Sequence, residues 1–268
     1  MILVRLSKQF SLNLVLISGL ISTCFAVEDN ERGYTVAARS DRTDLGFTDS
    51  DVDMQMVLHN AAGQSTTRKL SLKTLEKENE DVGDKSLIIF ESPADVDGTA
   101  LLSHAKILEP DDQWLFLPAL KRVKRISSAN KSGPFVGSEF AFEDFTALEL
   151  NKFTYKYIDS EKCGEFVCDI VERYPRYEYS GYTKQRIWID QSRYLLRKVD
   201  FYDRRGDLLK TLALTDYRLY QDKFWRAHRL SMNNHQTKKK TDLIYSLYKF
   251  KQGLNKRLFT KSSLKRIR

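Results

Sequence analysis

A long series of strand-like segments constrains the fold more than any other feature of this sequence. From Phe153 to Phe250, stretches rich in Tyr, Ile, Val and Thr alternate with compact turns such as Arg205-Gly206-Asp207. β-branched and aromatic residues favour extended backbone, and compact turns between such segments are typical of antiparallel neighbours. No part of the chain alternates strand and helix in the βαβ pattern. We therefore expect a single α+β domain built on one antiparallel sheet.

The chain before Phe153 continues this pattern with shorter strands and some helix. Alternation of apolar residues from Val52 to Leu58 places one face of a strand in the core. Helical character is expected over Gly33–Leu45, in a short capped helix at residues 137–145, and over Leu254–Ile267. Altogether we predict about ten to eleven strands and a few helices.

The first 26 residues have the composition of a secretory signal peptide. Arg5 and Lys8 give a positive start, an apolar stretch follows over residues 10–21, and a small-x-small motif ends at Ala26. We expect cleavage after Ala26, which leaves residues 27–268 as one exported domain located in the periplasm.

Two alternatives to a cleaved signal peptide stay open. An uncleaved membrane anchor is disfavoured because no second apolar stretch extends the segment. Lipid anchoring at Cys24 is disfavoured because Thr23 is a poor residue immediately before a lipidated cysteine. The intact mass of the mature protein distinguishes a cleaved signal peptide from these two alternatives.

Export decides how the remaining cysteines are interpreted. Cys163 and Cys168 are separated by four residues and flanked by strand-like sequence, in a chain assigned to an oxidising compartment. A zinc site needs further thiol or imidazole ligands at suitable spacing, and a thioredoxin-type pair has two intervening residues. We predict a disulfide across a β-hairpin that stabilises the fold and has no catalytic role.

The charge is unevenly distributed. The chain carries a formal net charge of +8, which by itself suggests nucleic acid or an anionic membrane as partner. Residues 27–112 hold 19 acidic and 9 basic residues, whereas residues 113–268 hold 17 acidic and 33 basic ones. Export argues against nucleic acid, so the basic part is better suited to anionic headgroups or an acidic protein.

Motifs for catalysis or metal binding are absent from the sequence. There is no G-x-S-x-G, no glycine-rich phosphate loop and no H-E-x-x-H, and the four histidines are scattered among different strands. We expect no catalytic residue, no metal site and no cofactor. An enzyme with a carboxylate pair that no motif reveals remains the alternative.

Several motifs together resemble the outer-membrane lipoprotein-sorting proteins, a branch of the LolA/LolB-like superfamily of periplasmic carriers. The resemblance covers most of residues 27–268. The elements that carry it are, in chain order, Phe90-x-x-Pro93-Ala94-Asp95, Gly98-Thr99-Ala100-Leu101-Leu102, Trp114-Leu115-Phe116-Leu117-Pro118, Arg125-Ile126, Phe135-x-Gly137-Ser138-x-Phe140, Asp144, and the closing Leu254 and Leu258-Phe259-Thr260 with Leu264.

The resemblance implies an incomplete, strongly curved antiparallel barrel whose concave apolar face is covered by helices. It implies a carrier, not an enzyme, that holds acyl chains of a lipoprotein or lipid in that half-barrel and delivers them towards the outer membrane. The donor or acceptor would be an inner-membrane transporter or an outer-membrane protein. The alternative is a lipid-sensing or adaptor module of an envelope signalling or export complex. We expect a monomer.

Strand alternation gives candidate residues for the cavity. Trp114 and Phe116 share one face of their strand, and Ile187 and Ile189 share one face of theirs, with Asp190 on the other. Taking the acidic side as outward, we predict that Trp114, Phe116, Ile187 and Ile189 line the lipid-binding cavity.

Overall fold

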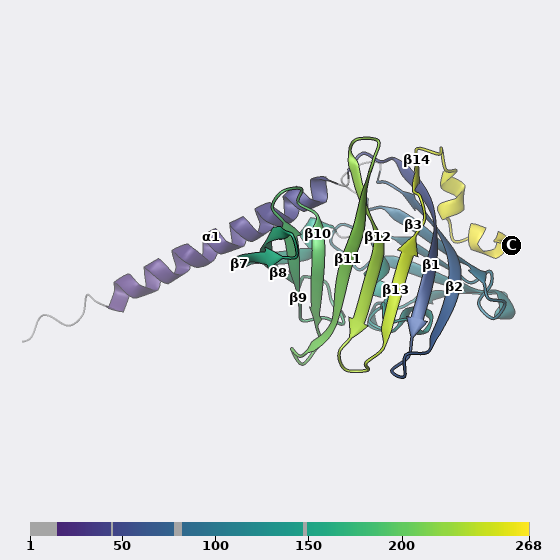
Figure 1. Ribbon diagram of the computed structural model, residues 1–268, viewed down its shortest axis with the longest axis horizontal. Coiled ribbons are helices and arrows are strands. Elements are labelled where there is room, and N and C mark those ends of the chain that lie inside the picture. Colours follow the sequence, from purple (N-terminus) through teal and green to yellow (C-terminus); the bar gives the residue numbers. More distant parts are fainter. Residues whose placement is uncertain (1–14, 44, 78–81, 147–148, 268) are drawn as a thin grey trace, which may run out of the picture.

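The structure, a computed structural model, is dominated by one large antiparallel sheet (Figure 1). It describes residues 15–43, 45–77, 82–146 and 149–267. The strands are β1 (Asp49–His59), β2 (Ser65–Leu75), β3 (Lys85–Ser92), β4 (Ala100–His104), β5 (Asp112–Leu117), β6 (Arg122–Ile126), β7 (Phe153–Cys163), β8 (Phe166–Pro175), β9 (Lys184–Asp190), β10 (Leu196–Tyr202), β11 (Leu208–Tyr220), β12 (Phe224–Asn234), β13 (Lys240–Tyr245) and β14 (Lys249–Phe250).

The sheet consists of two meanders joined edge to edge. Its order is β6-β5-β4-β3-β2-β1-β13-β12-β11-β10-β9-β8-β7, with Met54 of β1 opposite Tyr245 of β13 at the junction. The expected count of ten to eleven strands is too low, since the described residues form fourteen. Short segments become strands by pairing with a neighbour, as β14 does with Ser50 and Asp51.

The sheet is strongly curved and open, as predicted. Strands β3 and β9 are seven positions apart in the sheet order, which would separate them by about 34 Å if the sheet were flat. Ile88 of β3 and Ile187 of β9 nevertheless line one cavity. The described strands β6 and β7 form the two free edges, so the curved sheet stops short of a closed barrel.

The α-helix found among the described residues, α1 (Val15–Arg42), packs against the β7 edge. Gly33 lets the helix approach closely, because a Cβ at this position would lie 2.7 Å from the backbone nitrogen of Tyr157. In the docked part of the helix, Val36, Ala37 and Ala38 are buried. Its N-terminal part projects away from the sheet (Figure 1). The predicted helix at Gly33–Leu45 is thus the docked end of α1, which stops at Arg42.

The concave face is covered by the C-terminal end of α1 and by an irregular segment, where a few helices were expected. We call residues 127–152, which connect the two edge strands β6 and β7, the crossing segment. Its described residues, 127–146 and 149–152, form the short 3-10 turns η2 (Ser128–Asn130), η3 (Phe135–Gly137), η4 (Phe142–Phe145) and η5 (Leu150–Lys152). The capped helix predicted at residues 137–145 is absent, and the backbone N–H of Ala141 donates to Asp144 instead.

Contacts of the crossing segment span the middle of the sheet. Arg68 of β2 donates to the carbonyl of Val136 over 2.6 Å, and Thr241 of β13 accepts from the backbone N–H of Glu139 over 3.0 Å. Phe135 is fully buried against Phe90 of β3. The segment therefore places aromatic side chains inside the half-barrel and occupies part of its interior.

The opposite face of the sheet carries a second, smaller core. We call residues 254–267 the C-terminal cap; they form the 3-10 turns η6 (Lys256–Phe259) and η7 (Ser263–Arg266) where one longer helix was expected. Phe259 and Leu264 are fully buried against side chains of β2 to β5. In Figure 1 the cap is the yellow segment on the side of the sheet away from α1.

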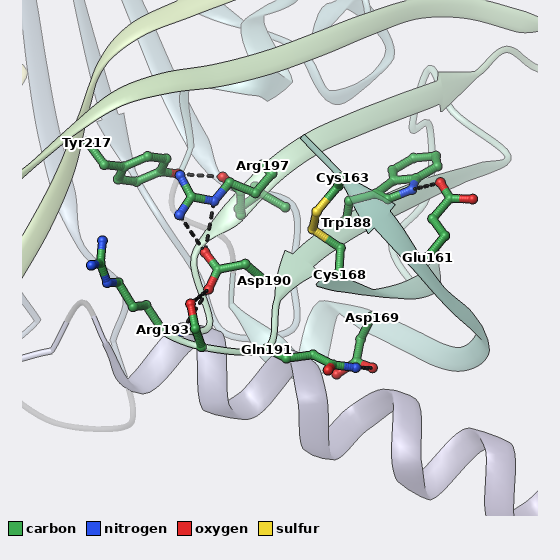
Figure 2. The surroundings of a disulfide bond; sticks show 12 residues. Glu161, Cys163, Cys168, Asp169, Trp188, Asp190, Gln191, Arg193, Arg197 and Tyr217 are labelled. Carbon is green, nitrogen blue, oxygen red and sulfur yellow. Dashed lines mark hydrogen bonds and ion pairs between the residues drawn. A yellow bond between two sulfur atoms is a disulfide. The ribbon is translucent and has the colours of Figure 1, made fainter. Parts of the chain in front are cut away.

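The predicted disulfide is confirmed. Cys163 and Cys168 are bonded across the β7–β8 hairpin, with their Cα atoms 5.9 Å apart. The bridge packs beside Trp188, whose indole N–H donates to Glu161 over 2.6 Å (Figure 2). The bond therefore ties together the end of a hairpin at the edge of the sheet.

Candidate functional site

A cavity of 470 Å³ lies between the curved sheet, the C-terminal end of α1 and the crossing segment. Pockets that hold small ligands have volumes of about 300–1,000 Å³. Its apolar lining comes from strands at both ends of the sheet and from the crossing segment: Leu72, Ile88, Phe145, Leu150, Tyr155, Ile187, Ile189, Leu196, Tyr245 and Tyr248. The cavity is thus a mainly apolar space inside the half-barrel.

A second cavity of 130 Å³ lies on the other side of the η4 turn. Asp144, Thr146, Arg173 and Leu196 line both cavities. Residues of the crossing segment, Asp144 and Thr146, therefore lie between the two cavities.

The structure separates the four residues predicted to line a lipid cavity. Ile187 and Ile189 are buried in the main core and line the larger cavity. Trp114 and Phe116 lie on the opposite face of the sheet, packed against the cluster beneath the C-terminal cap, so their predicted orientation is wrong. Leu115 faces the main core instead. Strand β5 is apolar on both faces, because each face of this part of the sheet has its own cover.

Asp144 fastens the crossing segment to the sheet. Lys210 of β11 donates to Asp144 Oδ2 over 2.7 Å, and the Tyr182 hydroxyl donates to Oδ1 over 2.8 Å. The side chains of Asp144 and Lys210 are 7% and 4% exposed. Burial raises the pKa of Tyr182 well above its ordinary value, and the neighbouring Asp144 reinforces the shift, so its hydroxyl stays a donor. The attachment is a buried polar contact.

Glu143, the neighbour of Asp144, is a carboxyl group in a largely buried setting. Burial raises its pKa to about 7, and the charge of Asp144 adds to the shift, while the N–H of Gly181 and the hydroxyl of Ser180 oppose it. These two groups donate to Glu143 over 2.8 and 3.0 Å. The crossing segment therefore carries a carboxyl group that changes charge near neutral pH.

Buried cations surround the smaller cavity. Lys131 and Lys152 both donate to Asp111, to its carbonyl and carboxylate respectively. Arg173 of β8 is 7% exposed and donates through Nε to Gln185 over 2.7 Å. Burial lowers the pKa of Arg173 and of Lys131. The site thus combines an apolar cavity with an unusual number of buried charges.

Sequence reasoning missed these charged residues, although a signal was present. Arg173 shares its strand face with the buried Val171, and Lys210 shares its face with the buried Leu212. A cation on the apolar face of a predicted strand marks a buried polar site. The partners could not be found this way because they lie far away along the chain.

The described part of the chain contains no group of three or more His, Cys, Asp or Glu side chains placed to hold a metal ion. It also contains no helix long and apolar enough to cross a membrane. The expected cleavage at Ala26 lies within α1, and residues 1–14 of the predicted signal peptide lie outside the described residues.

Comparison with known proteins places the chain in a family. A family model described as "Uncharacterized protein" matches residues 83–266. No curated protein matches the sequence. Similar solved structures do exist, and they cover most of the chain.

Two solved structures resemble the chain in sequence as well as fold. A putative outer membrane lipoprotein-sorting protein domain from Vibrio parahaemolyticus is 49% identical, with a TM-score of 0.85 over 88% of this chain and 99% of that one. A DUF1329 family protein from Desulfovibrio piger is 26% identical, with a TM-score of 0.83 over 88% and 99%. A LolA superfamily protein from Nitrosomonas europaea, 21% identical, shares the fold, with a TM-score of 0.68 over 85% and 97%.

The curved open sheet is the fold of the LolA superfamily structure. The chain belongs to the outer membrane lipoprotein-sorting protein family. The relative that shows the family is described as a putative lipoprotein-sorting protein domain.

Proposed function

We propose that this protein is a periplasmic carrier that holds acyl chains of a lipoprotein or lipid inside the half-barrel and delivers them towards the outer membrane. The observation that carries the proposal is the 470 Å³ cavity with aliphatic and aromatic lining, inside a carrier-like fold. Exposing an acyl chain to water costs about 0.8 kcal/mol per methylene. A carrier must therefore enclose the chain during transfer.

The crossing segment is suited to act as the movable cover. It separates two cavities, and its central turn is held by ion pairs and hydrogen bonds at Asp144 and Glu143. When the segment moves, water can replace such bonds, whereas a closely packed apolar cover has no equivalent replacement. We infer that acyl chains enter and leave between η4 and the sheet.

Export by a cleaved signal peptide is part of the proposal. Residues that dock α1 on the sheet begin at about Arg32, which stacks on the ring of Tyr157 with its guanidinium carbon 3.5 Å from the ring centroid. Cleavage after Ala26 would leave this docked part intact. The Cys163–Cys168 disulfide is consistent with an oxidising compartment.

The proposal is tested by filling the cavity. Leu72 lines the larger cavity and is only half-buried, so Leu72→Trp reduces the space with little strain. We expect this variant to lose at least tenfold in affinity for a fluorescent hexadecanoyl probe. Leu219→Trp, on an exposed leucine outside both cavities, is the matched control and should bind normally. Equal binding by both variants would contradict a role for this cavity.

Native mass spectrometry provides an independent test. Protein isolated from the periplasm should carry acyl ligands that Leu72→Trp lacks. An empty wild-type protein in every preparation, together with no binding of added acyl ligands, would argue against a carrier.

A lipid-sensing or adaptor module is the second candidate. The basic C-terminal cap, with its exposed lysines and arginines, favours a docking role of this kind. Capture of an envelope protein that is equally efficient with wild type and with Leu72→Trp would support the adaptor and not the carrier.

A further inference from the structure

The most informative group outside the apolar lining is the guanidinium of Arg173. It is 7% exposed, yet it lines both cavities, so its remaining accessible surface faces internal space. Its Nε donates to Gln185, and the guanidinium carbon lies 5.0 Å from the ring centroid of Phe153. Neither of these partners carries a negative charge.

Arg173 also lacks an ion pair within the part of the chain that the structure describes. The nearest acidic residues are engaged elsewhere: Asp144 pairs with Lys210 over 2.7 Å, and Asp111 pairs with Lys152. Buried charges in proteins are normally paired. Arg173 is thus a buried cation without a direct ion pair among the described residues, and the charge of Asp144 acts on it only from beyond ion-pair distance.

The other charged side chains around the smaller cavity set Arg173 apart. Three buried cations line it, Lys131, Lys152 and Arg173, and a fourth, Lys210, pairs with the lining residue Asp144. The buried carboxylates facing them are Asp111 and Asp144, and the third carboxyl, Glu143, holds its proton up to about neutral pH because burial raises its pKa to about 7. Glu178 also lines the cavity but is exposed to solvent. Of the four cations, the three lysines donate to Asp111 or Asp144, whereas Arg173 donates to Gln185.

We propose that the acyl ligand carries an anionic head, a carboxylate or a phosphate, and that this head binds Arg173 while the acyl chain occupies the 470 Å³ cavity. Guanidinium groups bind both kinds of oxyanion through paired N–H donors. Because Arg173 lines both cavities, a head bound there leaves the larger, apolar one open to the chain. This inference rests on the proposed function and specifies its ligand class.

The experiment compares ligands that share a sixteen-carbon chain and differ in the head. Affinities of the delipidated protein for hexadecanoate, hexadecyl phosphate and hexadecanol are measured by displacement of a fluorescent acyl probe. We expect both anions to bind wild-type protein at least tenfold more tightly than the alcohol. The anion that binds with the higher affinity indicates the natural ligand. Preference for hexadecanoate would indicate a free fatty acid, and preference for hexadecyl phosphate would indicate a phospholipid head.

Arg173→Gln should reduce this preference to less than threefold while the affinity for hexadecanol stays unchanged. Arg173→Lys, which keeps the charge, should retain part of the preference. The matched control is Arg218→Gln, on a half-exposed arginine of β11 paired with Asp216 outside the cavities, and it should keep the full preference. If Arg173→Gln fails to fold, the affinities of wild-type protein for the three ligands still test whether the ligand has an anionic head.

The outcomes separate the two proposals. Equal affinity of wild-type protein for all three ligands, or an unchanged preference in a folded Arg173→Gln variant, would overturn the anionic head and leave the carrier standing. Absence of binding by all three ligands would instead count against the carrier itself.

Discussion

The two faces of the sheet are covered in different ways. The crossing segment lies on the concave face, where it leaves cavities of 470 and 130 Å³ and is attached through buried charges. The C-terminal cap lies on the other face, where Phe259 and Leu264 are fully buried in an apolar cluster. Both covers are short 3-10 turns without a long helix.

The difference indicates which cover can open. Apolar close packing is lost entirely when a cover lifts, because nothing in water replaces the contacts. Hydrogen bonds and ion pairs are exchanged for bonds to water, so their net contribution is smaller. The difference supports the proposal that ligand binds at the concave face, and it favours a structural role for the cap.

The largest expected effect comes from removing an aromatic ring from the cap. Phe259→Ala should lower the free energy of unfolding by about 4 kcal/mol, because it creates a void in a packed cluster. Phe145→Ala, beside the existing cavity, should cost only about 2 kcal/mol, since the ring is half-buried and borders open space. Chemical denaturation measures both. Equal losses in the free energy of unfolding would contradict the conclusion that the cap is the more tightly packed of the two covers.

Asp144 tests the polar attachment of the crossing segment. Asp144→Asn leaves the buried Lys210 without its counter-charge, which should cost about 3 to 4 kcal/mol of stability. The same variant should also release bound acyl probe faster, because the crossing segment is less firmly held. Asp216→Asn, which breaks an exposed pair with Arg218, is the control and should cost at most about 1 kcal/mol. A stable variant with unchanged release would show that this ion pair does not hold the cover.

Glu143 makes the concave cover sensitive to pH. Its pKa is raised from 4.5 to about 7 in the folded state, so between these values the folded protein holds a proton that the unfolded chain has lost. Stability should therefore fall as pH rises from about 5 to 7, by about 3 kcal/mol in all from this group, and level off above.

Glu143→Gln removes this component of the pH dependence. Denaturation at several pH values compares it with wild type and with Glu178→Gln, an exposed neighbour that should behave like wild type. An identical pH profile in wild type and Glu143→Gln would contradict the assignment.

The hairpin disulfide lies outside both covers, and its removal should have the smallest effect on ligand binding. Replacing Cys163 and Cys168 by Ala should cost about 2 kcal/mol, as expected for closing a short loop. Affinity for acyl ligands should be unchanged, which ligand titration checks. A large loss of affinity would extend the site to the edge of the sheet.

The sequence predicted the regular parts of the fold better than the covers. Strands and the Cys163–Cys168 bridge follow from local alternation and spacing. The crossing segment has no periodicity, so its 3-10 turns and its path were not predictable. The Asp144–Lys210 pair joins residues 66 positions apart, and no local pattern encodes it. Strand β5 was ambiguous because Trp114 and Leu115, on opposite faces, are both apolar.

Hydrogen exchange with and without hexadecanoate tests the central claim most directly. The account predicts that amides of the crossing segment, such as those of Phe142 and Glu143, exchange faster than those of Leu258 and Ser263 in the cap. Ligand should slow exchange in the crossing segment at least tenfold and leave the cap unchanged. Equal exchange in both covers that hexadecanoate does not alter would contradict an opening cover on the concave face.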